Sequence, residues 1–440
     1  MYIMPMPPAT ILVISWLTMF LVGTELFVFS PLLPMLAADY GVSSMRAGWC
    51  VTAFSLTYMG SALLLGYVSD RVGRRRVLIC SLLAFGAANL LTAAAPSLPW
   101  LIAARSFAGA AAGGVAPSIY ALVSSAAPPN RRAAWLALPV SGLLVALALG
   151  ASVGAAAGAA FGWASVFVAL AAFSLVLAGF NCRVWPCERL RTDAAGPRPD
   201  LLAGAVLARR LMPTIMWGTS LYGAYTYLGT GLTAVAFSPA QVARAILCYG
   251  CAAIAGALIG GCLADRVGTK FTAGASLAGL CGCFLLLRLA LSADAFVEFT
   301  LGLSSAVAQL FFPAQQAGLA KDFPARSGTV LAWNNSALFL GIALGSLIGG
   351  SAAAIGGFHG TLAICAGIAL FGCIINEIVV PGPTQSPRSS GLAAVRRVLT
   401  ARYGTARQIP GRRQSEAEGL KPPLCSRSPS AHRSAERTGS

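Results

Sequence analysis

The sequence predicts an all-α integral membrane protein with twelve transmembrane helices, arranged as two six-helix halves related by pseudo-symmetry. Three observations predict this fold class. Of the 440 residues, 57% are hydrophobic and only 10% are charged, whereas about a quarter of the residues of a soluble domain are charged. A stretch of about 20 mostly apolar residues can span a bilayer, and twelve such stretches follow one another. Finally, several short matches recur at one offset of 195 residues.

The predicted helices are separated by short connections, with one exception. They cover residues 11–36, 47–69, 77–95, 99–127, 133–160, 163–180, 211–236, 243–264, 271–291, 295–319, 328–352 and 357–380. The polar stretch 181–210 predicts a cytoplasmic linker between an N-terminal bundle, 1–180, and a C-terminal bundle, 211–380. Residues 381–440 are rich in Ser, Pro, Gly and Arg without a sustained apolar period, which predicts a disordered, basic cytoplasmic tail.

The formal net charge of +17 would suggest a nucleic-acid-binding protein if the chain were soluble. If the N-terminus is cytoplasmic, 27 of the 31 Lys and Arg residues fall in cytoplasmic connections or in the tail, and only three fall outside. Such a bias is the positive-inside signal of a membrane protein. We therefore expect a multi-pass protein of the cell (inner or plasma) membrane with both termini cytoplasmic, surrounded by lipid and without a nucleic-acid partner.

The composition argues against several functional classes. His359 and His432 are the only histidines, which leaves little material for imidazole metal sites or histidine-based catalysis. The chain also lacks the Gly-x-x-x-x-Gly-Lys-Ser/Thr loop of ATP-driven pumps. We expect a protein that is not an enzyme and that needs neither a metal ion nor another cofactor.

A motif after the second predicted helix returns after the eighth. Its first copy consists of Gly66, Asp70, Arg71, Gly73 and Arg75, and its second copy of Gly261, Asp265, Arg266, Gly268 and Lys270. The same offset aligns residues 23–26 with 218–221 and residues 148–154 with 343–349. The halves are thus parallel repeats, because each begins on the cytoplasmic side. Two such repeats facing each other across a central site are typical of transporters.

The duplicated motif closely resembles that of the major facilitator superfamily, over about residues 9–380. This resemblance implies a substrate cavity between the halves, lined by the first, fourth, seventh and tenth helices, and alternating access by rocking of the halves. It also implies that the two motif copies form a cytoplasmic latch that stabilises one facing state. A purely topological role of the basic residues is compatible with that latch.

Glu25 is the only acidic residue well inside a predicted helix. A carboxylate at such depth is costly unless it is neutralised or paired, and burial favours its protonated form. This is the property that a proton-coupling residue needs. The repeat places Ser220 at the equivalent position, so the symmetry does not require an acid there. A structural carboxylate that is hydrogen-bonded between helices is the alternative.

Arg105 is the other deeply placed charge. From the helical rise, it lies at a depth similar to that of Glu25, so we expect the two side chains to pair directly or through water. The segment Arg-Ser-Phe-Ala-Gly that begins at Arg105 resembles the helix 4 arginine motif of the family, although the usual Gln-Gly is absent. The alternative is an arginine whose side chain reaches outward to the membrane surface.

Two further groups of residues are candidates. Gly150, Gly154 and Gly158 resemble the antiporter motif of exporters, with Ser152 where Pro is common. The glycines at 341, 345 and 349 have the same spacing, so close helix packing explains part of both patterns. Polar residues within predicted helices are possible substrate contacts, with interhelical hydrogen bonding as the alternative; they are Tyr225, Tyr227, Gln315, Gln316, Asn334 and Asn335.

These residues together resemble those of bacterial proton-coupled drug and sugar-efflux exporters, including the chloramphenicol-resistance type. The resemblance implies export of small organic compounds, with the proton gradient as driving force and a monomer as the functional unit. A uniporter or a proton symporter that imports a small metabolite is the alternative on the same fold. A non-transporting membrane receptor or assembly factor is the alternative of another class. The substrate, the direction of transport and the proton stoichiometry are left open by the sequence.

Overall fold

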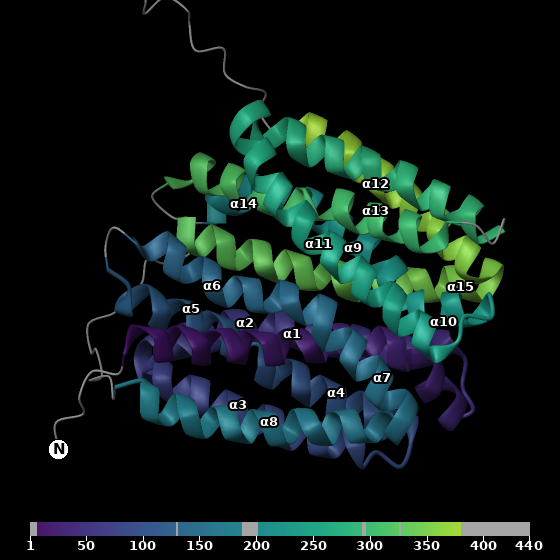
Figure 1. The fold of residues 1–440 in the computed structure, drawn as a ribbon. Helices are drawn as coiled ribbons and strands as arrows, with labels where there is room; N and C mark the ends of the chain where they lie inside the picture. Colours follow the sequence, from purple (N-terminus) through teal and green to yellow (C-terminus); the bar gives the residue numbers. More distant parts are fainter. Residues whose placement is uncertain (1–6, 129–130, 187–200, 293–295, 325–326, 380–440) are drawn as a thin grey trace, which may run out of the picture. The chain divides into compact units, whose positions relative to one another are not determined.

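Long helices run side by side along one direction in the computed structural model (Figure 1), which describes residues 7–128, 131–186, 201–292, 296–324 and 327–379. These residues belong to one compact unit, Met1–Pro383. Within the described part of the chain, ten helices are long and apolar enough to cross a membrane. The predicted tail, 381–440, lies outside the described residues.

The helices of the first half fall on the first six predicted spans. They are α1 (Pro8–Asp39), α2 (Ser44–Val72), α3 (Arg74–Ala93), α4 (Leu98–Ala112), α5 (Val115–Ala126), α6 (Arg132–Val145), the π-helical turn η2 (Ala146–Gly150), α7 (Ala151–Phe161) and α8 (Trp163–Val184). Helices α4 and α5 share one predicted span, and α6, η2 and α7 share another. The predicted apolar runs therefore locate the spans but do not show their internal breaks.

The second half repeats this order. Its helices are α9 (Leu201–Thr226), α10 (Leu228–Ala234), α11 (Pro239–Val267), α12 (Thr269–Ser292), α13 (Val297–Gln309), α14 (Phe311–Asp322) and α15 (Ser327–Val379). Two predicted spans, 328–352 and 357–380, both lie on α15, which turns at Gly356 and Gly357, where the backbone is not helical. The predicted span 211–236 is divided between α9 and α10 at Tyr227.

The helices extend into the predicted linker, 181–210. Helix α8 continues to Val184, and α9 begins at Leu201, while residues 187–200 lie outside the described part. Leu and Ala, which favour helix, dominate residues 201–208. The prediction ended the linker later because Arg209 and Arg210 interrupt the apolar run.

The 195-residue repeat is visible in the local geometry of the helix ends. Ser43 and Ser238, one offset apart, both cap a helix by accepting a hydrogen bond from the backbone N–H three residues later. Gly73 and Gly268 have φ of 104° and 98° and end α2 and α11. Such positive φ values strain residues other than glycine, so the motif glycines are needed for the turns between α2 and α3 and between α11 and α12.

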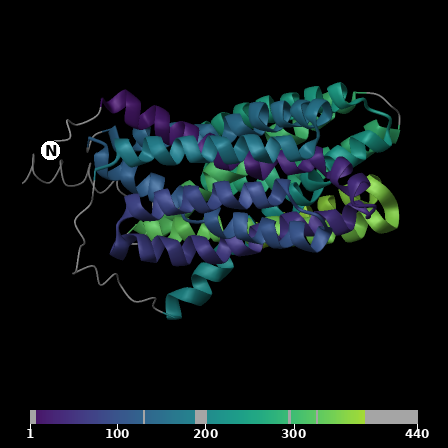
Figure 2. The ribbon, with the colours of Figure 1, turned by 90° about the horizontal axis from the view of Figure 1, so that it is seen from below.

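These turns define the two ends of the bundle. We call the end with Gly73 and Gly268 the basic end, because Arg74, Arg75 and Arg76 begin α3 there. The turn at Gly162, with φ of 82°, and the turn of α15 lie at the opposite end. Figures 1 and 2 show the start of α1 at the basic end and the first-half and second-half helices packed along their length.

Candidate functional site

Glu25 of α1 and Arg105 of α4 form an ion pair in the middle of the first half. The Arg105 Nη1 donates a hydrogen bond to Glu25 Oε1. Both residues are fully enclosed, with 0% of Glu25 and 1% of Arg105 exposed. The structure thus brings together the two charged side chains that the sequence places at a similar depth.

Aromatic rings surround the guanidinium of Arg105. Its central carbon lies 4.6 Å from the ring centre of Phe54, 5.0 Å from that of Phe29 and 5.7 Å from that of Phe167. Ring faces attract cations within about 6 Å, so α1, α2 and α8 each help to hold the charge. The sequence did not predict these rings, because apolar residues in a membrane helix carry no sign of which neighbour they face.

One polar atom of each member of the pair lacks a hydrogen-bond partner in the part of the chain that the structure describes. Glu25 Oε2 and Arg105 Nε have no hydrogen-bond partner among the described residues. The positions one repeat later carry small hydroxyl groups: Ser220 donates to Cys365 O at 2.7 Å and Thr300 to Val297 O at 3.0 Å. The charged pair therefore belongs to the first half alone.

A different face of α1 meets the second half. The Tyr225 hydroxyl donates to Phe27 O at 2.9 Å, and the Ser30 hydroxyl donates to Tyr225 O. The rings of Phe27 and Tyr222 stack with centres 6.4 Å apart. Helix α1 thus forms the ion pair with α4 of its own half and the aromatic contacts with α9 of the other half. Tyr225, a predicted substrate contact, lies at this boundary and holds the two halves together.

Tyr227 connects helices of both halves at the break between α9 and α10. Its hydroxyl donates to Ser346 O at 2.7 Å, and Ser346 Oγ donates to Gly48 O of α2 at 2.8 Å. A Cβ atom at Gly48 or at Gly350 would collide with the Tyr227 hydroxyl. The Tyr227 ring therefore fits between two glycines, one from each half.

The other predicted substrate contacts divide into two kinds. Gln315 donates to Arg210 O at 2.8 Å, and Asn334 accepts from Thr214 at 2.7 Å; these are bonds between helices of the second half. Asn335 instead lies at the boundary of the halves, where it interacts with the Tyr58 hydroxyl. The Tyr58 ring stacks on Phe339 across the same boundary, with ring centres 3.6 Å apart.

The duplicated motif forms equivalent bonds in the two halves. Arg75 donates to Cys182 O at 2.5 Å, and Lys270 donates to Glu377 O at 2.9 Å; both donors and both acceptors are one repeat apart. Each motif thus ties the start of the third helix of its half to the end of the sixth.

The remaining motif residues lie at the same end of the bundle. Arg71 lies over the Tyr67 ring at 4.3 Å, and Asp265 and Arg266 are exposed. The side chain of Asp70 lies outside the described residues, so its predicted part in a latch stays a prediction. Gly66 and Gly261 have open space where a side chain would be.

Helix α1 packs closely against the antiporter-type glycines. A Cβ atom at Gly150, Gly154 or Gly158 would collide with Thr24, Val28 or Leu32, respectively, each four residues after the last. In the second half, Gly341, Gly345 and Gly349 receive the backbone of α9 in the same way. Small residues at this spacing allow close helix packing, which is the contact that both patterns make.

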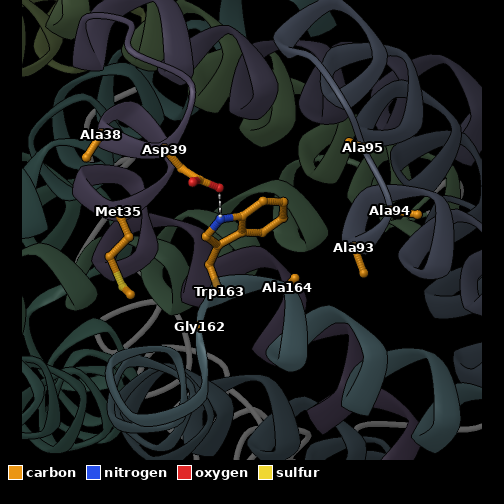
Figure 3. Close-up of a pocket in the computed structure, with 9 residues that line it drawn as sticks. All are labelled: Met35, Ala38, Asp39, Ala93, Ala94, Ala95, Gly162, Trp163 and Ala164. Carbon is orange, nitrogen blue, oxygen red and sulfur yellow. Dashed lines mark hydrogen bonds between the residues drawn. The ribbon is translucent and has the colours of Figure 1, made fainter.

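An open groove of about 770 Å³ lies at the opposite end of the first half. Figure 3 shows the Trp163 indole pointing to Asp39, to which it donates a hydrogen bond of 2.9 Å. Next to it, the Tyr40 hydroxyl donates to Ala95 O at 2.7 Å, and burial, together with the nearby Asp39 carboxylate, raises the pKa of Tyr40. Met35 is the groove residue nearest to Glu25 along α1, about 15 Å away by helical rise, so the groove is separate from the pair.

Among the described residues, no group of three or more His, Cys, Asp or Glu side chains could hold a metal ion.

Comparisons with known proteins agree with this architecture. The family model of the Major Facilitator Superfamily matches residues 15–243 and again residues 214–410, so it matches the two halves in turn. The uncharacterised MFS-type transporter YceJ of Bacillus subtilis is 29% identical, over 76% of this chain and 86% of its own length. A chloramphenicol resistance protein of Streptomyces lividans is 28% identical, over 56% of this chain and 64% of its own.

A solved structure has the same fold. The crystal structure of a D-xylose–proton symporter superposes with a TM-score of 0.71, covering 85% of this chain and 98% of the symporter at 16% sequence identity.

Proposed function

The chain belongs to the major facilitator superfamily, and we propose that it is a proton-coupled exporter of small organic compounds that works by alternating access. As a member of this family it is a multi-pass membrane transporter. In our proposal it lies in the plasma (inner) membrane with both termini cytoplasmic. The proton gradient is its only energy source, no cofactor takes part, and the monomer is the working unit.

The buried ion pair of Glu25 and Arg105 carries the proposal. Protonation of Glu25 removes the negative charge that holds Arg105, and a buried charge without a partner is costly. The rings of Phe29, Phe54 and Phe167 continue to stabilise the guanidinium while the carboxyl group is neutral. The pair can therefore open and close in response to one proton.

Helix α1 can transmit this change to the contact between the halves. Glu25 and Phe27 are only two residues apart, and Phe27 contacts Tyr222 and Tyr225 of the second half. A small shift of α1 when the ion pair opens would displace these aromatic contacts. Protonation from outside would then favour the return to the inward-facing state, with substrate and proton competing for the transporter.

Two observations support the outward direction. A relative is a chloramphenicol resistance protein, and resistance by a transporter is most simply achieved by efflux. The glycines of η2 and α7 that receive α1 have the spacing of the motif typical of antiporters. They also place α1, which carries Glu25, in direct contact with the fifth span.

The test is uptake of a substrate into everted membrane vesicles with an imposed proton gradient. The substrate is chosen by growth of an expressing strain on a panel of toxic compounds that includes chloramphenicol. We expect Glu25→Gln to reduce gradient-driven uptake to the level of vesicles without the protein, because the carboxamide cannot exchange a proton. Passive equilibration of the substrate should persist.

Glu298→Gln is the matched control. Glu298 also pairs with an arginine, Arg244 at 2.7 Å, but on the exposed end of α13, so this variant should transport like the parent. Gradient-driven uptake that is unchanged in Glu25→Gln would refute the coupling role of Glu25. Substrate accumulation in the opposite direction would refute export.

A further inference from the structure

A third polar side chain, Asn89 of α3, lies beside the ion pair. Asn89 is fully buried, and its Nδ2 donates to Phe85 O at 3.0 Å within its own helix. Its amide lies near enough to Glu25 to interact with the carboxyl group. The second N–H of this amide is available for another acceptor, because a carboxamide carries two.

Two acceptor atoms of this cluster have no hydrogen-bond donor in the described part of the structure. Glu25 Oε1 is occupied by Arg105, but Glu25 Oε2 and Asn89 Oδ1 have no partner among the described residues. Both atoms are acceptors, so neither can satisfy the other. A buried acceptor without a donor is unfavourable, and a single hydrogen between the two oxygens would satisfy both.

The cluster is not imposed by the symmetry of the fold. One repeat later, the three positions of Glu25, Asn89 and Arg105 carry Ser220, Phe284 and Thr300. Phe284 belongs to the apolar core. The position equivalent to Asn89 in the second half is thus occupied by an apolar ring, and the fold does not require an amide there. The acid, the amide and the guanidinium therefore occur together in the first half only.

We propose that Asn89 is a positioning residue that holds the exchangeable proton of Glu25. When the carboxyl group is protonated, its O–H donates to Asn89 Oδ1; when it is ionised, it accepts from the second Nδ2–H. The proton comes from the aqueous phase, forms a bond with Glu25 Oε2 and returns to water, so no other reactant is consumed. This inference rests on the proposed function, because it assigns a partner to the proton that Glu25 exchanges.

Few other titratable groups face this cluster. Arg105 approaches from α4, and the Cys50 thiol of α2 lies near Arg105. From α8 and from α1 itself, the phenyl rings of Phe167 and Phe29 close the site. Among the described residues, the amide of Asn89 is thus the neutral group that can bond with Glu25 in both of its protonation states.

Infrared difference spectroscopy of the full-length protein in proteoliposomes tests this inference. A pH step should reveal the carbonyl stretch of a protonated carboxyl group, and the band that is missing in Glu25→Gln belongs to Glu25. In Asn89→Leu, we expect this band to move to higher frequency, because the O–H has lost its acceptor. We also expect half-protonation at a roughly tenfold lower proton concentration, because the bond that the ionised form loses is stronger than the bond that the protonated form loses.

Control variants separate this effect from the loss of a buried amide in general. Asn376 of α15 is also buried, donates to Lys270 O at 3.2 Å and has an unpartnered Oδ1, so Asn376→Leu should leave the Glu25 band unchanged. Asn89→Gln, which restores an amide, should return the band toward the parent frequency. Asn89→Ala replaces Asn89→Leu if the leucine side chain prevents folding.

The outcomes distinguish the two proposals. A Glu25 band with the same frequency and the same half-protonation point in Asn89→Leu and Asn89→Ala would overturn the role of Asn89 alone. A parent protein without any band that depends on Glu25 would overturn proton exchange at Glu25, and with it the proposed coupling. Equal shifts in the Asn89 and Asn376 variants would also overturn the specific role of Asn89.

Discussion

Arg105 is held by two kinds of contact, and they respond differently to protonation of Glu25. The ion pair depends on the charge of the carboxylate, whereas the three aromatic rings attract the guanidinium whatever the state of Glu25. A buried charge that loses its only partner destabilises a protein strongly. The rings reduce this cost, so the arginine can stay in place while the carboxyl group is neutral.

Removal of Arg105 alone should therefore destabilise the protein more than removal of the Glu25 charge alone, because the aromatic rings still hold Arg105 when the carboxylate is lost. Arg105→Met leaves Glu25 buried without a counter-charge, and we expect the free energy of unfolding to fall by about 3–5 kcal/mol at pH 8. The loss should shrink as the pH is lowered, because the folded variant then binds a proton at Glu25 and the buried charge disappears. Denaturant unfolding of the purified protein in mixed micelles at several pH values measures both effects.

The double variant Glu25→Gln/Arg105→Met is the control for this prediction. It removes both charges together, so most of the stability should return. A double variant whose loss equals the sum of the two single losses would show that the side chains do not depend on each other.

At the scale of helices, the sequence predicted where spans lie better than where they break. In the structure, Ser43 and Ser238 cap helices and Gly73 and Gly268 form turns at equivalent points of the two halves. Of these residues, only the two motif glycines were singled out from the sequence. The break at Tyr227 was not predicted, because it depends on partners that are distant in sequence: Ser346 accepts its hydrogen bond, and Gly48 and Gly350 leave room for its ring. The pairing of Glu25 with Arg105 was foreseeable because both charges are isolated, whereas Asn89 is an amide with no such signal.

The fit of Tyr227 between two glycines predicts sensitivity to a single methyl group. Gly48→Ala and Gly350→Ala should each lower the free energy of unfolding by about 1–3 kcal/mol, because the added Cβ overlaps the Tyr227 hydroxyl. Tyr227→Phe removes that hydroxyl and should recover part of the loss in the background of Gly48→Ala. Unfolding experiments on the single and double variants measure this coupling.

Matched controls come from the same two helices. At Gly60 of α2 and Gly367 of α15, no neighbouring atom lies within 4 Å of the place that an added methyl group would occupy, so Gly60→Ala and Gly367→Ala should be close to neutral. If they destabilise the protein as much as Gly48→Ala does, the effect comes from glycine replacement in general and not from Tyr227.

For the whole molecule, the contacts between the halves gather from the middle of the bundle toward the end opposite the basic end. They include Phe27 with Tyr225, Tyr58 with Phe339, and Thr52 with Ala343. Toward the basic end, Tyr67 of α2 is 53% exposed and Trp333 of α15 is 42% exposed. In the proposed orientation, with the basic end in the cytoplasm, these contacts between the halves lie toward the outer side of the membrane.

An exporter must separate these contacts once in every cycle, and a covalent link across them should therefore stop transport. Thr52 Oγ1 lies 3.4 Å from Ala343 O across the boundary of the halves. In a background without the 12 native cysteines, we expect oxidation of Thr52→Cys/Ala343→Cys to abolish gradient-driven uptake and a reductant to restore it.

The control is Thr214→Cys/Asn334→Cys, which joins two helices of the second half whose side chains are hydrogen-bonded at 2.7 Å. Its oxidation should leave uptake intact. Full uptake by a completely cross-linked Thr52→Cys/Ala343→Cys protein would mean that the halves do not part at this boundary during transport, and it would contradict alternating access by their separation.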